Sequence, residues 1–142
     1  MSMNRARFGL MGIFLVSLML QLIAFFLTRN KMWPEELVPL VLKLLGIYSV
    51  QLGVILGGIF AQPKAPLAEP PSGLAWTAFV LVAMWNLLLA WRSISFSVAA
   101  QDSVTDVIKY LDSIASSSSF LVAGVLAFFF TKGTADIANS TR

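Results

Sequence analysis

Four long apolar runs, separated by short polar or proline-rich stretches, dominate the hydrophobic pattern of this chain. The first, residues 8–28, carries no charge and as a helix measures about 31 Å, the thickness of a bilayer's hydrocarbon core. The others cover about 38–60, 74–97 and 110–131. Backbone groups in a membrane must satisfy one another's hydrogen bonds, so the pattern predicts an all-α integral membrane protein. We expect a single four-span domain over residues 1–142, with short loops, in which each helix lies antiparallel beside the next.

Helix-start signals precede the second and fourth spans. Pro34 suits the first helical position, where its missing N–H is not needed, although Pro39 allows a kink or a later start. Ser103 and Asp106 resemble a capping box, with Asp in place of Glu or Gln. The last helix is therefore expected from about 104 to 131, with its first two turns extended beyond the bilayer.

Small side chains recur every fourth residue on two of the spans. The line on the second span and the shorter line on the fourth consist of Ser49, Gly53, Gly57, Ala61 and of Ser119, Ala123, Ala127. Lipid is as apolar as leucine, so membrane helices associate where small residues let their backbones approach. The longer line predicts a tight contact, either with another span of the same chain or with a second copy.

Lys43 is the one charge well inside the second span. An ionisable group within a membrane marks a functional site by default, here an anion site or a pore charge. The structural alternative is that its ammonium reaches back to the interface or pairs with Glu36, two turns earlier on nearly the same face.

Polar residues follow two stripes at helical spacing around the third linker. The stripe on the third span consists of Asn86, Ser93, Ser97 and Gln101, and that on the fourth of Asp102, Asp106, Lys109, Ser113 and Ser116. One interpretation is a hydrogen-bonded hairpin with a solvated acidic tip. A second is a water-filled vestibule in an oligomer, where carboxylates attract cations. A third is a docking surface for a partner protein.

Other polar residues within the spans are expected to bond helix to helix. Ser17 and Gln21 on the first span, and Tyr48 and Gln51 on the second, are the candidates.

Composition supports the membrane assignment. Hydrophobic residues make up 58% of the chain and charged residues 12%, against about 25% charged in soluble domains. The net charge is +3, but Lys and Arg are scattered at segment ends without a patch that would bind nucleic acid. They are expected to orient the spans instead.

Candidate chemistry is missing from the sequence. The chain has no histidine and no cysteine, which removes the commonest general base and the thiolate ligands. Catalytic and metal-binding motifs are also absent. We expect a protein that is not an enzyme, with no catalytic residue, metal or cofactor.

Orientation follows weakly from charge. Four spans place both termini on the same side of the membrane. Arg5 and Arg7 precede the first span, and positive charge beside a first span favours a cytoplasmic location for the termini. We expect the membrane to be a bacterial inner (plasma) membrane.

Three functions are compatible with these patterns. The leading hypothesis is a non-enzymatic homo-oligomeric membrane subunit that anchors or signals to a partner protein, as an accessory, sensor or defence-type component. The alternative is a small oligomeric pore or ion channel lined by the polar stripes of the third and fourth spans. The third is a small transporter that uses Lys43.

Overall fold

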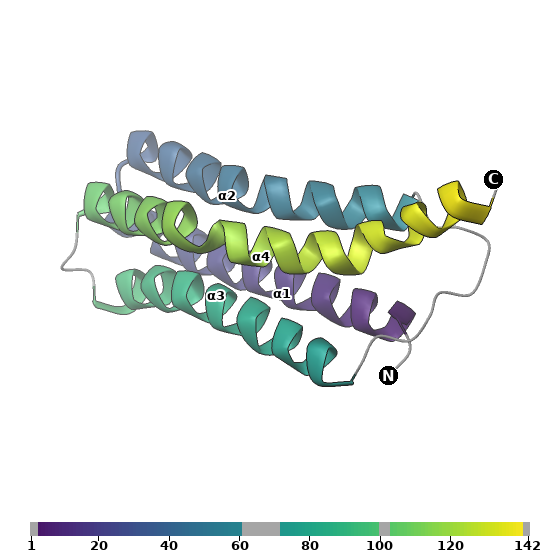
Figure 1. Ribbon diagram of the computed structural model, residues 1–142. Helices are drawn as coiled ribbons and strands as arrows, with labels where there is room; N and C mark the ends of the chain where they lie inside the picture. The colour runs from purple at the N-terminus through teal and green to yellow at the C-terminus, as the bar shows by residue number, and fades with distance from the viewer. Residues whose placement is uncertain (1–2, 61–71, 100–102, 141–142) are drawn as a thin grey trace.

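Four long helices form the computed structural model (Figure 1). They are α1 (Met3–Thr28), α2 (Pro34–Phe60), α3 (Ser72–Ala99) and α4 (Val104–Ser140), with a short 3-10 helix η1 (Arg29–Lys31) after α1. The structure describes residues 3–60, 72–99 and 103–140, and their side chains over 5–30, 32–60, 73–98 and 103–130. All four helices are long and apolar enough to cross a membrane. The chain is therefore an all-helical bundle with the build of an integral membrane protein.

The helices alternate in direction, so α1 begins and α4 ends at the same end of the bundle (Figure 1). The most extensive contacts join α1 to α3 and α2 to α4, two parallel pairs, while α1–α2 and α3–α4 form antiparallel contacts. The expectation that every helix lies beside the next is wrong for α2 and α3, which the other two helices separate. Their connection, residues 61–71, is long enough not to force them together.

Local signals explain where α2 and α4 begin. Pro34 is the first residue of α2, which continues through Pro39 without a break. Glu36 accepts a hydrogen bond from the Trp33 backbone N–H at 3.0 Å, which closes the start of the helix. At α4, Ser103 Oγ accepts from the Asp106 backbone N–H at 3.2 Å, which confirms Ser103 as the N-cap. The Asp106 carboxylate accepts from the Ser103 hydroxyl at 2.8 Å, rather than from the Ser103 backbone N–H that a full capping box uses.

The end of α4 differs from the expected residue 131. The helix has 37 residues and runs to Ser140, and it passes the ends of α2 on both sides in Figure 1.

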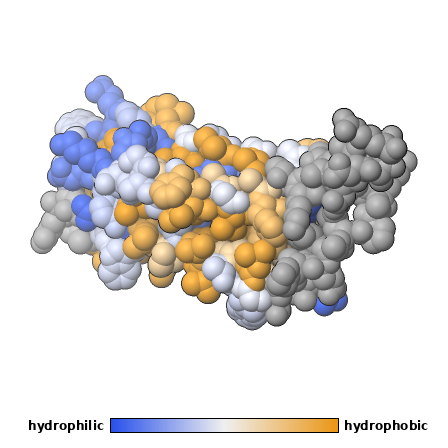
Figure 2. Space-filling view, in the orientation of Figure 1, coloured by the Kyte–Doolittle hydropathy of each residue, from blue (hydrophilic) through white to orange (hydrophobic). Residues whose placement is uncertain are grey.

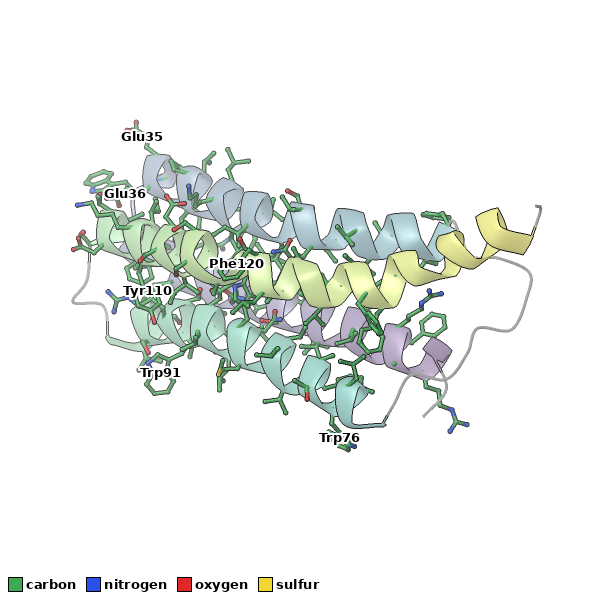
Figure 3. The ribbon with its side chains drawn as sticks, in the orientation of Figure 1. Glu35, Glu36, Trp76, Trp91, Tyr110 and Phe120 are labelled. Carbon is green, nitrogen blue, oxygen red and sulfur yellow. The ribbon has the colours of Figure 1, made fainter. Side chains whose placement is uncertain are left out.

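The core consists of apolar side chains from all four helices, including Phe14, Tyr48, Trp85, Leu111 and Phe129. Figure 2 shows hydrophobic residues across the middle of the molecule and hydrophilic ones at the end where α2 and α4 begin. Figure 3 shows Trp76 and Trp91 pointing outward at different heights along α3, as in an aromatic belt.

Candidate functional site

The centre of the bundle holds a hydrogen-bonded cluster around the Tyr48 hydroxyl, here called the Tyr48 network. This hydroxyl donates to Asn86 Oδ1 at 2.9 Å and accepts from Gln21 Nε2 at 2.7 Å. Ser17 Oγ lies 2.9 Å away and donates as well, because the single Tyr48 proton is already used. Ser93 Oγ donates to Gln21 Oε1 at 2.9 Å. Five side chains thus join α1, α2 and α3, and four of them are hydroxyls or amides that titrate at no ordinary pH.

Packing around this network is aromatic and tight. The Phe14, Tyr48 and Trp85 rings lie 5.6–6.1 Å apart, centre to centre. Trp85 Nε1 and Gln51 Oε1 are buried without a hydrogen-bond partner in the described part of the chain. The expectation that Ser17, Gln21 and Tyr48 bond helix to helix is confirmed.

Asn86 and Ser93, two members of the polar stripe of the third span, are buried members of this network. Their polar groups serve the protomer's own core: Ser93 donates to Gln21, and the Asn86 amide also donates to the Val82 carbonyl at 2.9 Å. Asn86 is 3% exposed and Ser93 is fully buried. Ser97 is half-buried, while Gln101 and Asp102 lie outside the described residues.

A second polar contact joins α2 to α4. Lys43 Nζ lies 2.5 Å from Asp112 Oδ1, and the two side chains are 35% and 52% exposed. The proposed pairing of Lys43 with Glu36 is not made, because Glu36 closes the start of α2 instead. Sequence reasoning missed Asp112, although a lysine inside a span without an acid beside it calls for an acid on a neighbouring helix.

Arg7 also differs from expectation. Its side chain is buried at the end of the bundle, where Nε donates to the Phe129 carbonyl at 2.7 Å and the guanidinium lies 5.6 Å from the centre of the Phe130 ring. Arg7 therefore ties α1 to α4 as well as carrying charge.

The first half of α4 presents polar side chains outward, a surface here called the α4 polar face. Its members are Thr105, Asp106, Lys109, Asp112, Ser113, Ser116 and Ser117. Ser116 Oγ donates to the Ser113 carbonyl at 3.2 Å and Ser117 Oγ to the same carbonyl at 2.5 Å. In Figure 3 the face lies between the start of α4, near Tyr110, and Phe120 farther along the helix.

The small-residue line of the second span also points outward. Together with Gly46 it forms the α2 small-residue face, whose members are Gly46, Ser49, Gly53 and Gly57. A Cβ added at any of the three glycines would meet no atom within 4 Å. The contact expected within one chain is not made, and Ala61 lies outside the described residues.

Gly58, one residue along, makes the close approach instead. A Cβ there would lie 2.7 Å from the Phe130 carbonyl oxygen and would also collide with the Phe130 side chain. The line on α4, Ser119, Ala123 and Ala127, is half-buried.

An open groove of about 520 Å³ runs between α1 and α3. Its lining is apolar except for Ser17 and Asn86, so the Tyr48 network approaches the outer surface there. Gly12 lines this groove, and a Cβ at Gly12 would meet no atom within 4 Å.

No group of three or more His, Cys, Asp or Glu side chains gathers as a metal site within the described ranges. The described residues therefore form an interior held by the Tyr48 network and two exposed surfaces, the α2 small-residue face and the α4 polar face. Comparison with protein family models, with curated proteins and with solved structures gives no match to this chain.

Proposed function

We propose that this chain is a non-enzymatic membrane subunit that assembles with copies of itself and anchors or signals to a partner protein. An accessory, sensor or defence-type component of a bacterial inner membrane, with cytoplasmic termini, fits this proposal. The observation that carries it is the α2 small-residue face, which is exposed although its sequence is that of a helix contact.

Glycine within a helix costs about 1 kcal/mol relative to alanine. Gly46, Gly53 and Gly57 gain no contact inside the protomer in return. On a membrane protein, small residues at an outer surface stabilise a helix that lies directly against them. A second copy of the chain supplies such a helix without any additional gene product.

The length of α4 supports the proposal that its ends extend beyond the bilayer and bind a partner protein. A helix of 37 residues measures about 55 Å, longer than the roughly 30 Å hydrocarbon core. We take α4 to extend beyond the bilayer, which gives a partner protein a surface to bind outside the lipid.

The test is co-purification of two differently tagged copies expressed in one membrane. The wild-type pair should purify together, and Gly57→Leu should separate them, because leucine holds the α2 backbones apart. Gly12→Leu is the matched control, since it places leucine in the open groove between α1 and α3, where an added Cβ also meets no atom within 4 Å. The proposal fails if wild-type copies do not purify together, or if Gly12→Leu separates them as effectively as Gly57→Leu.

One observation favours the pore as a second candidate. The α4 polar face exposes Lys109, Asp112, Ser113 and Ser116, the kind of lining an aqueous path needs. Because Asn86 and Ser93 are buried, such a pore would be lined by α4 rather than by both stripes. Ion flux into liposomes that falls in Lys109→Gln would support this candidate, and no flux from the wild type would remove it.

The transporter hypothesis gains no support from Lys43, whose ammonium is paired with Asp112.

A further inference from the structure

The outward surface of α4 differs from that of its three neighbours. Between Val104 and Ser119, α4 exposes no large hydrophobic side chain, whereas Phe120 and Leu121 immediately beyond are exposed. The α4 polar face thus occupies about half of a candidate span that runs from Val104 to Phe130.

At the same level along the bundle, the neighbouring helix α2 exposes apolar side chains. The Lys43–Asp112 ion pair sets α4 against α2, so Lys109–Ser116 runs beside the second to fourth turns of α2. Those turns expose Val38, Leu42 and Leu45, with Leu42 62% exposed. Lipid that covers these leucines would also reach the α4 polar face if nothing else covered it.

Hydrocarbon is a poor cover for this surface. The Ser116 and Ser117 hydroxyls are satisfied by their own helix, so the serines tolerate a dry environment. Charged side chains do not tolerate a dry environment, because a Lys or Asp in a membrane span is unfavourable unless it is paired or hydrated. Asp112 stays half exposed despite its ion pair, and Lys109 has no carboxylate partner within the part of the chain that the structure describes.

We infer that the α4 polar face packs against the same face of a second copy, around a rotation axis along the helices. Charge alternates as Asp106, Lys109, Asp112, in steps of three residues or about 4.5 Å. In two parallel copies, each lysine therefore reaches the carboxylates one turn away on its partner. The serines that follow these charges, Ser113, Ser116 and Ser117, let the backbones approach closely.

The inference rests on the proposed self-assembly and identifies its central contact. It places α4 at the symmetry axis, and the assembly requires both this contact and the one that the α2 small-residue face makes.

Absence of cysteine from the chain makes disulfide trapping a direct test in native membranes. Ser116→Cys and Ser113→Cys should each form a covalent dimer on mild oxidation. Leu87→Cys, on a 66% exposed site of α3, should remain monomeric. In the Ser116→Cys background, Lys109→Glu should lower the cross-linked fraction about tenfold, because three acids then face three acids. Lys109→Arg, which keeps the charge, should leave that fraction unchanged.

Two results would overturn the inference and spare the proposed function. In the first, Gly53→Cys on α2 cross-links but both α4 cysteines do not. In the second, the α4 cysteines react with a membrane-impermeant charged thiol reagent rather than with each other, which assigns the face to a water-filled pore.

Two further results are also decisive. Cross-linking of Leu87→Cys as strong as that of Ser116→Cys would mean random collision and would overturn the α4 contact. Failure of every α2 and α4 cysteine to cross-link would remove both the α4 contact and the self-assembly.

Discussion

Tyr48 joins three helices through one oxygen atom. Its hydroxyl contacts Ser17 and Gln21 on α1 and Asn86 on α3, and its ring packs against Phe14 and Trp85. Polar atoms buried in a membrane bundle contribute most when every donor meets an acceptor. Tyr48 therefore determines the position of α2 relative to α1 and α3.

Tyr48→Phe should destabilise the protomer by about 1–2 kcal/mol, because it removes three buried hydrogen bonds and leaves Asn86 Oδ1 without its hydroxyl donor. Unfolding in mixed detergent, followed by circular dichroism, measures the loss. Tyr110→Phe is the control: its ring lies over Arg92 and remains in the variant. Equal losses from the two variants would contradict the central role of the Tyr48 network.

The Lys43–Asp112 ion pair is a second single-residue test. Lys43→Met should leave Asp112 without a partner and destabilise the bundle by about 1 kcal/mol. Adding Asp112→Asn to Lys43→Met should recover part of that loss, since the unpaired charge is then gone. Additive losses in this double-mutant cycle would show that the two side chains do not interact in the membrane.

At the level of the helix, α2 has two kinds of glycine on neighbouring positions. Gly58 lies against Phe130 of α4, while Gly57 faces outward with open space around it. The sequence pattern favoured Gly57 as the contact because it stands in the four-residue line. Which face turned inward could not be read from hydrophobicity, because core and lipid are equally apolar environments for α2.

Leucine at these two positions should have opposite effects on the protomer. Gly58→Leu should cost about 1–3 kcal/mol through overpacking against the α4 backbone. Gly57→Leu should leave the monomer's free energy of unfolding unchanged or slightly higher, since it removes a helical glycine. Detergent unfolding of monomeric protein compares them, and a larger loss for Gly57→Leu would mean that α2 is rotated from its observed position.

Helix positions were more predictable than helix partners. Apolar runs of membrane length, Pro34 and the Ser103–Asp106 cap identify the four helices and two of their starts. Partners such as Asp112 for Lys43 depend on how two helices are rotated and staggered. Small offsets in either decide which polar atoms meet, and no local pattern encodes them.

At the scale of the whole molecule, polarity is distributed in two places with different consequences. The Tyr48 network is buried and its members bond to one another across three helices, which fixes the bundle. The α2 small-residue face and the α4 polar face lie on the outside and remain open in a single copy. A bundle of this kind is complete as a fold, but its outer surface is not uniformly apolar, and the association of copies that we propose would cover both faces.

Mass measurement of particles ejected directly from membrane vesicles tests this self-assembly most directly. The account predicts that the wild type appears as a multiple of the 15.5 kDa chain and that Gly53→Leu/Gly57→Leu shifts the signal toward single chains. A wild-type signal at 15.5 kDa alone, in vesicles that preserve other membrane assemblies, would contradict it.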